Sequence, residues 1–509
     1  MAQQLQNITI AAPGFGGINT QDSPLLQPQG FASICDNAVI DKQGRIAARK
    51  GHSMVSTNGA SVLGSSDGIE HINEFVQEDG TKVFFSAGNN AIFSGDTTLT
   101  DITPGAYTIT ANNWSSCSLG NKFYMFQRDH APLVYDPSTS ALTLITAHAA
   151  AQGTPPHAHI CLAAYGRVWA ADVTGNKKTL YWSDLLDGVD WNSGSSGSLD
   201  LTNVWPSGYD EITALGTHNN FLIIFGKHSL IVYAGADDPS TMVLSDTVEN
   251  IGAVSRDVVV SIGSDLIFVD FTGVRSLGRT IQEKSAPIGD ISRNVNFDIK
   301  TLIAADYANI KTVFDPNNAF VLIAFTGIGS TYAFDTRFPL DDGSLRATTW
   351  SSILPLAFLL NDSDELLFGI KSGVSKYNLM TDIGNDYVMS YYSHPMDFGD
   401  SSRLKFLKKI NLITFQGSEA NVTLQWAYDY KSSYKKRVFT LPQSNEAFYN
   451  LSEFNEGAEY SESPQLINEQ RVNASGSGTV VQIGLETTVS GKEIAIQQLN
   501  VQSLVGRML

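Results

Sequence analysis

Hydrophobic positions along this chain mostly alternate with polar ones or come in short runs, and helical spacing is hard to find. Gly, Asn, Asp and Ser bound the runs, which is typical of short β-strands joined by turns. Seven segments share one order: an apolar strand, a turn, a more hydrophobic strand, a second turn and a third strand. They are residues 74–95, 116–136, 161–184, 214–235, 258–279, 313–335 and 357–378.

The spacing of these segments identifies their architecture. Successive segments begin roughly 40 to 55 residues apart, which is the period of a four-stranded propeller blade. Six or seven blades fit between about Ala60 and Asn378. A tandem of β-sandwiches would explain the alternation but not the regular recurrence. The sequence therefore predicts an all-β fold with a β-propeller of six or seven blades.

The pattern changes after Asn378 to longer alternating strands. Residues 421–428, 479–485 and 493–497 alternate cleanly, which predicts a half-buried antiparallel sheet and most simply a β-sandwich. Between them, residues 444–470 are acidic and rich in turn formers, and we expect a long loop there.

The first fifty residues contain a glycine-rich stretch that looks like a phosphate-binding loop. Such a loop needs its glycines between a buried strand and a helix. Here Pro24 and Pro28 follow in a run of turn residues that cannot open a long helix. The stretch instead predicts an extended arm and then a hairpin, with strands at residues 38–40 and 45–47 around the turn 41–44. Arms of this kind usually tie one part of a chain, or one subunit, to another.

Composition narrows the classes of partner. The 509 residues include 42% hydrophobic ones, enough for real cores. A net charge of -18 argues against a general nucleic-acid or membrane-surface binder. Residues 61–375 hold about 34 acidic and about 17 basic residues, so this region carries nearly all of the net negative charge.

Basic residues gather instead in three clusters outside the propeller region. Each cluster is either a solvated strand face or a contact site for an acidic partner. The clusters are Lys42, Arg45, Arg49 and Lys50; Arg403, Lys405, Lys408 and Lys409; and Lys431, Lys435, Lys436 and Arg437.

Cysteines and targeting signals indicate the compartment. Cys35, Cys117 and Cys161 are odd in number and widely spaced, which favours neither a disulfide framework nor a zinc site. The N-terminus has no signal-peptide pattern, and no apolar run is long enough for a membrane-spanning segment. We expect a protein that is made and folded in a cytoplasm.

Catalytic signatures are sparse. The YWSD sequence at residues 181–184 occurs once, and no glycosidase-type box or arginine cluster is present. His157 and His159 could face one side of a strand, a spacing compatible with a metal, but no third ligand is identifiable. Many Asp residues end strands, where they cap turns. We therefore expect no catalytic residue, no cofactor and no metal.

Three groups of residues along the chain form recognisable motifs. They are Gly16, Gly17, Asn37, Gly44, Arg49 and Gly51 near the start, Gly252, Ser255, Gly263, Gly273 and Val274 in the propeller region, and Gly476, Gly478, Gly506 and Arg507 near the end. Together these motifs resemble the tail nozzle, or tail tubular protein B, of short-tailed bacteriophages. In that family a glycine-rich start, an Asn-containing strand and a hairpin ending in RxG precede a propeller.

The resemblance implies a division of the chain and a function. Residues 1–55 and 379–509 would form a platform domain that carries residues 56–378 as a propeller. Six subunits would form a ring below the phage portal and adaptor, with tail fibres, tailspikes or a needle as further partners. The ring would be part of a virion assembled in the host cytoplasm, and genomic DNA would pass through its lumen without specific binding.

The charge distribution agrees with this implication. Acidic walls keep DNA mobile, whereas each neutralised phosphate adds affinity. We expect part of the propeller's acidity to face the channel and the basic clusters to make assembly contacts. The alternatives are a glycan-acting propeller enzyme, such as a depolymerase, and a monomeric adhesion propeller. The candidate assembly residues are Arg45, Arg49, Lys50, Arg403, Lys405, Lys408, Lys409, Lys435, Lys436 and Arg437.

Overall fold

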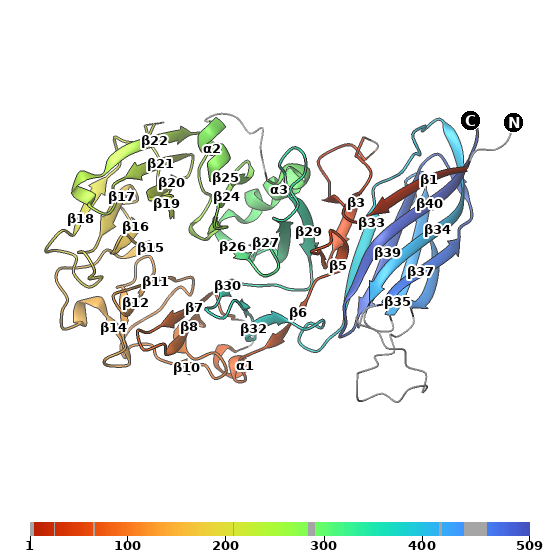
Figure 1. Ribbon diagram of the computed structural model, residues 1–509. Helices are drawn as coiled ribbons and strands as arrows, with labels where there is room; N and C mark the ends of the chain where they lie inside the picture. Colours follow the sequence, from red (N-terminus) through yellow and green to blue (C-terminus); the bar gives the residue numbers. More distant parts are fainter. Residues whose placement is uncertain are drawn as a thin grey trace.

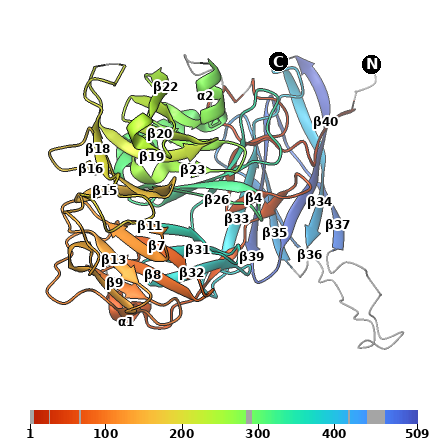
Figure 2. The ribbon, with the colours of Figure 1, turned by 60° about the vertical axis from the view of Figure 1, so that its left-hand side comes forward.

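The computed structural model describes residues 5–24, 26–64, 67–206, 208–283, 291–416, 420–441 and 466–508. A ring of small sheets lies beside two large packed sheets, here called the platform (Figures 1 and 2). Helices are few in this part of the chain: α1 (Gly59–Leu63), α2 (Leu277–Glu283) and α3 (Asn296–Asp306), with short 3-10 helices η1 (Ile145–Ala147), η2 (Pro239–Thr241), η3 (Arg256–Val258), η4 (Arg293–Val295) and η5 (Tyr307–Asn309). No helix among the residues described is long and apolar enough to cross a bilayer.

The ring is a β-propeller, which confirms the fold class predicted from the sequence. Within the described ranges it has six four-stranded blades, and a three-stranded sheet takes a seventh position. The first four blades are β7 (His71–Val76), β8 (Lys82–Gly88), β9 (Ala91–Ser94) and β10 (Thr100–Asp101); β11 (Ser115–Leu119), β12 (Lys122–Phe126), β13 (Leu133–Asp136) and β14 (Ala141–Leu144); β15 (Ala158–Ala164), β16 (Arg167–Val173), β17 (Thr179–Trp182) and β18 (Gly197–Asp200); and β19 (Ile212–His218), β20 (Phe221–Gly226), β21 (Ser229–Ala234) and β22 (Val243–Glu249).

The remaining sheets complete the ring. The three-stranded sheet is β23 (Val259–Ser261), β24 (Leu266–Asp270) and β25 (Gly273–Ser276). The last two blades are β26 (Ile310–Asp315), β27 (Phe320–Phe325), β28 (Ser330–Asp335) and β29 (Arg346–Trp350), and then β30 (Ala357–Leu360), β31 (Leu366–Ile370), β32 (Gly373–Asn378) and β6 (Gly51–Met54). Because β6 comes from the N-terminal side and pairs with β32, it closes the ring. Residues 51–54, which the resemblance assigns to the platform, thus form a strand of the propeller.

Turn residues and apolar strands explain the blades. Asn89 and Asn90 both have positive φ between β8 and β9, and Asn219 and Asn220 repeat this between β19 and β20. Two consecutive residues with positive φ give the tight turn that suits the twist of a hairpin. The apolar faces then pack blade against blade: the ring of Phe85 on β8 stacks on that of Phe123 on β12, with centroids 4.4 Å apart. The propeller core therefore lies between neighbouring blades.

The platform takes strands from both ends of the chain. One sheet has the order β37 (Leu466–Asn473), β34 (Arg403–Gln416), β40 (Ile494–Met508), β5 (Ile46–Ala48) and β4 (Ala38–Ile40), with β1 (Leu5–Ala11) on β40 and β38 (Ser477–Gly478) on β34. The predicted hairpin forms as β4 and β5, and Asp41 caps its turn by accepting hydrogen bonds from the backbone of Gln43 and Arg45. The arm and hairpin thus lie along the C-terminal strand.

The second platform sheet is continuous with a propeller blade. Its ten strands run β26-β27-β28-β29-β3-β33-β39-β35-β36, with β2 (Gly17–Ile18) on β3. The platform members are β3 (Phe31–Asp36), β33 (Tyr387–Ser393), β39 (Val481–Val489), β35 (Ala420–Tyr428) and β36 (Lys435–Leu441). This shared sheet joins the two parts. Residues 466–470 are strand rather than the predicted loop, and residues 444–465 of that loop lie outside the described residues.

The glycine-rich arm is used for close packing. Gly17 has a φ of 77°, and a Cβ there would lie 2.6 Å from the carbonyl oxygen of Ala347 on β29. Gly30 has a φ of 105°, and a Cβ there would lie 2.1 Å from the carbonyl oxygen of Gly14. Both sites admit only glycine without a backbone shift. The arm therefore packs against the propeller blade. The described residues between β2 and β3, 19–24 and 26–30, contain no helix.

Candidate functional site

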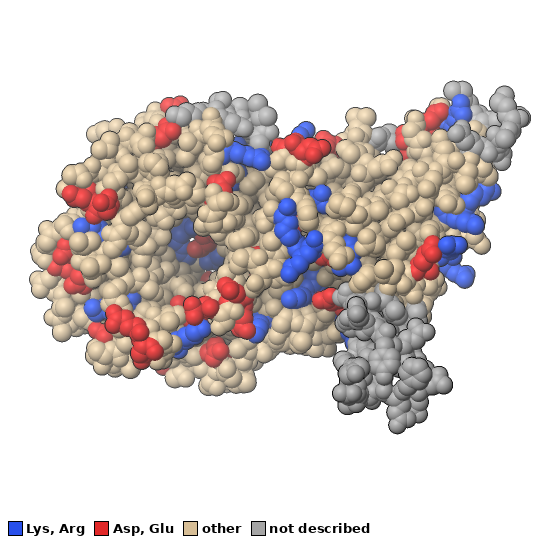
Figure 3. Space-filling model, in the orientation of Figure 1, with Lys and Arg blue, Asp and Glu red and all other residues tan. Residues whose placement is uncertain are grey.

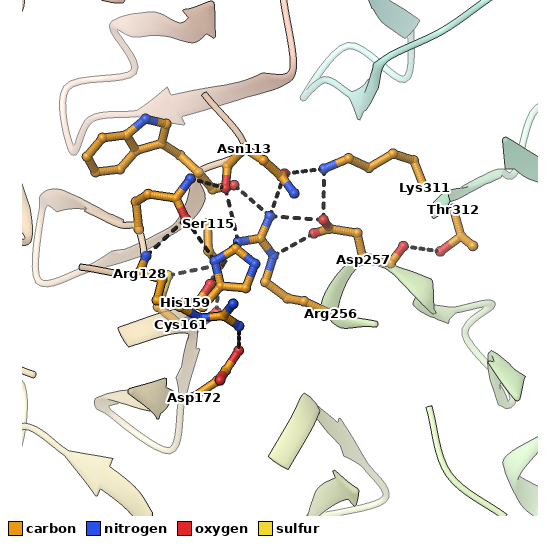
Figure 4. Close-up of polar contacts among 12 residues, drawn as sticks. Asn113, Ser115, Arg128, His159, Cys161, Asp172, Arg256, Asp257, Lys311 and Thr312 are labelled. Atoms are coloured by element: carbon orange, nitrogen blue, oxygen red, sulfur yellow. Dashed lines mark hydrogen bonds and ion pairs between the residues drawn. The ribbon is translucent and has the colours of Figure 1, made fainter. Parts of the chain in front are cut away.

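The centre of the propeller holds a polar cluster around a cavity of about 270 Å³ (Figure 4). Side chains reach it from the innermost strands and from η3. Those used below are His71 from β7, His159 from β15, Arg256 and Asp257 from η3, and Lys311 from β26. Because these residues come from four different elements of the ring, contacts among them hold blades together.

Arg256 is the main connection. Its guanidinium donates to the carbonyl oxygen of His159 at 2.7 Å and to the Oδ1 atom of Asn113, just before β11, at 2.7 Å. It also donates to the carbonyl oxygen of Trp114 at 3.1 Å. Its Nε atom lies 2.9 Å from Asp257 Oδ1. The N–H groups of the planar guanidinium thus bond to groups on β15, on the segment before β11 and on η3.

Lys311 and Asp257 complete the cluster. Lys311 Nζ lies 2.8 Å from Asp257 Oδ2 and donates to Asn113 Oδ1 at 2.5 Å. Burial opposes the ionisation of Asp257, but the charges of Arg256 and Lys311 hold its pKa well below the usual range. Burial lowers the pKa of Lys311, and Asp257 opposes that shift. The three groups form a partly buried charge network.

Burial and neighbouring cations lower the pKa values of the two central histidines. Burial, with the charges of Lys311 and Arg256, lowers the pKa of His71 to about 3. Burial, with the charges of Arg256 and Arg128, lowers the pKa of His159 to about 2. His157 is exposed just before β15, whereas His159 Nδ1 lies 2.8 Å from Gln127 Oε1 and 3.4 Å from Arg256 Nη1. An arginine beside the imidazole repels a cation, and no group of three metal-ligating side chains occurs in the part of the chain described.

The second candidate site lies where the propeller meets the platform, around Arg49. Its side chain is fully buried, and its two terminal nitrogens lie 2.9 and 2.7 Å from the two Asp382 oxygens. Its Nε atom donates to Asn37 Oδ1 at 3.0 Å, and the guanidinium lies 4.2 Å from the ring centroid of Tyr387 on β33. Arg49 therefore links the hairpin, the loop after β32 and the platform.

The neighbours of Asp382 resemble a hydrolase triad only in composition. His52 Nδ1 lies 3.3 Å from Asp382 Oδ1, and the Ser352 hydroxyl donates to Asp382 Oδ2 at 2.9 Å. A nucleophilic serine needs the histidine as its base, whereas here serine and histidine both bond to the carboxylate. Burial raises the pKa of Asp382, but hydrogen bonds from His52 and Arg49 and the Arg49 charge hold it well below its usual range. The geometry is that of an ion-pair anchor.

The predicted assembly residues divide into buried and exposed sets. Arg49 and Lys405 are fully buried, so the subunit surface does not present them and their predicted role needs correction. Lys405 Nζ donates to the carbonyl oxygens of Thr479, at 2.9 Å, and Asp400. Arg45 is also largely buried: it pairs with Asp41 at 2.5 Å and stacks on Phe415. Burial of these cations follows from partners that are distant in sequence or on the backbone, which the local pattern does not reveal.

The other predicted residues are exposed. Lys408 and Lys409 lie on β34, and Arg403 begins that strand in an ion pair with Asp400. Lys435, Lys436 and Arg437 lie together on β36, and Lys50 lies beside the junction. In the view of Figure 3, blue side chains gather over the junction and the platform, and red side chains are more frequent over the propeller. Only Lys435, Lys436 and Arg437 are three consecutive cations on one strand, and they are here called the basic row.

Sequence reasoning missed Arg256, Asp257, Lys311 and Asp382. A signal existed for the first three, because charged residues stand at the beginning of apolar strands in the sequences RDVVV and IKTVF. The three cysteines are free and buried.

Comparisons with known proteins identify no family. No protein-family profile matches the sequence, and no curated protein matches it. The BT4673 extracellular domain from B. thetaiotaomicron aligns with a TM-score of 0.41 and 11% identity, over 69% of this chain and 46% of that chain. The Pan2 WD40 domain of Neurospora crassa gives 0.37 and 10%, over 65% and 95%. YCF48 bound to D1 peptide gives 0.39 and 10%, over 70% and 99%. This chain spans less than half of the BT4673 domain, and likenesses this low carry over no function.

Proposed function

We propose that this chain is a structural subunit of the tail nozzle of a short-tailed bacteriophage. Six copies form a ring below the portal and adaptor, and genomic DNA leaves through the lumen without specific binding. Tail fibres, tailspikes or a needle meet the ring at its far end. The protein belongs to the virion tail, is assembled in the host cytoplasm and catalyses no reaction.

The observation that carries the proposal is the platform built from both ends of the chain. The arm strand β1 and the hairpin strand β5 both pair with the C-terminal strand β40. The propeller is inserted in the sequence between β5 and the C-terminal strands of the platform. This is the arrangement that the motifs at the two ends imply. The ten-stranded sheet and Arg49 then join propeller and platform at the level of backbone and buried charge. A subunit held together in this way suits a conduit that must withstand the passage of DNA.

The propeller centre supports a structural role. Arg256, Asp257 and Lys311 bond to one another and to groups of neighbouring blades. Groups that are engaged in this way are poor nucleophiles and poor general bases, because a reacting group needs a free position facing the substrate. The excess of acidic residues in the propeller supports an acidic channel wall that keeps DNA mobile.

Sedimentation of the purified chain with a portal–adaptor complex tests the proposal. We expect six copies to bind per complex, with no turnover of capsular polysaccharide by the same preparation. A monomer that ignores the complex and depolymerises the polysaccharide, with activity lost on changing an Asp or Glu near the propeller axis, would establish the glycan-acting alternative instead. A monomer that neither joins the complex nor acts on the polysaccharide would favour the adhesion propeller.

A further inference from the structure

Two outermost strands of the subunit have the same length and opposite charge. β22 (Val243–Glu249) ends the blade that begins with β19, and β36 (Lys435–Leu441) ends the ten-stranded sheet. Each has seven residues, and in the described part of the chain no strand pairs with its outer side. Such an edge presents unpaired N–H and C=O groups that can receive another strand.

The β36 edge is basic and partly apolar. Lys435, Lys436 and Arg437 are all exposed, and Val438 beside them is 62% exposed. Lys435 Nζ donates to the carbonyl oxygen of Ser475 at 3.1 Å, whereas Lys436 and Arg437 make no ion pair among the residues described. Three consecutive cations repel one another, so a negatively charged neighbour would lower the energy of this edge.

The β22 edge is complementary to it. Val243 is 64% exposed and Leu244 is 44% exposed, which is unusual for two adjacent apolar residues on a strand. Glu249 is exposed at the other end of the strand, and Asp246 lies between them. The strand contains no basic residue. It therefore offers apolar contacts at one end and carboxylates at the middle and the other end.

The two edges cannot meet within one chain. β22 lies on the outer rim of the propeller and β36 lies in the platform, and Figure 2, in which both strands are labelled, shows them far apart. A contact between them must join two copies of the chain. Because different surfaces meet, the contact is head-to-tail, and its repetition gives a ring if the rotation closes and a filament if it does not.

We infer that β36 of one copy pairs with β22 of a neighbouring copy and extends its sheet. Backbone hydrogen bonds hold the strands together, and the contacts of Lys436 and Arg437 with Asp246 and Glu249 select the partner. The contact would build the ring of the proposed function, but it is argued from the two strands alone. The competing role of the basic row is to protect an exposed edge against aggregation. In that case its charge would not matter for association between copies.

Sedimentation velocity of the full chain over a range of concentrations separates these roles. The test variant is K436E/R437E, at the two cations that would contact the partner, and the matched control is K300E/K371E. The control changes the net charge equally at two exposed lysines outside the predicted assembly residues, one on α3 and one between β31 and β32. The reciprocal variant is D246K/E249K on β22. We expect the test variant and the reciprocal variant each to weaken self-association about tenfold, since each replaces attraction by repulsion at two positions. The control should associate like the unmodified chain.

Mixing gives the decisive result. K436E/R437E mixed with D246K/E249K should associate more strongly than either variant alone, because one of the two possible contacts regains opposite charges. Equal association of all variants, or a chain that stays monomeric at every concentration, would overturn the inference. If both variants still add six copies to a portal–adaptor complex, the proposed function stands and the strand contact is wrong.

Discussion

Replacement of Arg49 is the sharpest test of how propeller and platform are joined. In Arg49→Met the side chain keeps much of its volume and loses its charge, so Asp382 is left without the cation that it faces at 2.7 Å. The Arg49 side chain is 0% exposed and the Asp382 side chain is 12% exposed, so water cannot replace the lost partner well. Removing one member of a buried ion pair costs about 3 to 5 kcal/mol.

The matched control is Arg403→Met. Arg403 also pairs with an aspartate, Asp400, at 3.1 Å, but the two side chains are 48% and 39% exposed. Exposed pairs contribute about 0 to 1 kcal/mol. Both variants remove one positive charge, so a difference between them reports on burial rather than on net charge.

Urea unfolding followed by circular dichroism measures both variants. We expect the first transition of Arg49→Met to move to clearly lower urea, and that of Arg403→Met to stay near the unmodified chain. The double variant R49M/D382N should regain part of the loss, because it removes the unpaired carboxylate charge as well. A transition of Arg49→Met that coincides with that of Arg403→Met would refute the assignment of Arg49 as a buried anchor.

Three further predictions concern charge, backbone and thiols. The pKa values of Asp257 and Asp382 are held below their usual range, so the stability that the two carboxylates contribute is present above about pH 4 and is lost as pH falls toward the folded-state pKa values. Urea midpoints measured at pH 7, 5, 4 and 3 should drop most steeply below about pH 4. A midpoint that does not change with pH would contradict the charge network. Gly17→Ala should destabilise the fold by more than Gly80→Ala. Both glycines have positive φ, but a Cβ at position 17 would lie 2.6 Å from a backbone oxygen, whereas a Cβ at position 80 would meet nothing within 4 Å. Thermal unfolding of the two variants measures the difference, and equal midpoints would show that the arm is not packed against β29. Burial raises the pKa of Cys35, and the hydrogen bond with Cys161 and burial raise the pKa of Cys117. A thiol reagent should therefore label neither cysteine in the native chain and both in guanidinium. Rapid labelling of the native chain would place these thiols at the surface.

Local chemistry made much of the fold predictable. The hairpin of β4 and β5 follows from two short apolar runs around an Asp-to-Gly turn, and Asp41 makes the capping bonds that such a turn needs. The blades follow from Asn and Gly pairs that accept positive φ between apolar strands. These signals act over a few residues, so they can be read along the chain.

Long-range pairing was not predictable in the same way. The parallel contact of β29 with β3 joins positions 349 and 36, and the local sequence of neither strand identifies its partner. Arg49 and Lys405 have the sequence pattern of surface cations, and only their distant partners explain their burial. β34 was identified in the sequence only as a basic cluster, because the Lys residues at 405, 408 and 409 interrupt its alternation. Tertiary partners decide such positions, and a single sequence does not reveal them.

Electron microscopy of the purified chain with its candidate portal–adaptor complex tests the central claim most directly. The account predicts a sixfold collar of added density at the distal end of the ring, with a continuous axial channel whose wall carries acidic residues of the propeller. A complex without added density, beside a chain that remains monomeric, would contradict the nozzle function. A collar with a basic or neutral lumen would keep the assembly and refute the acidic channel.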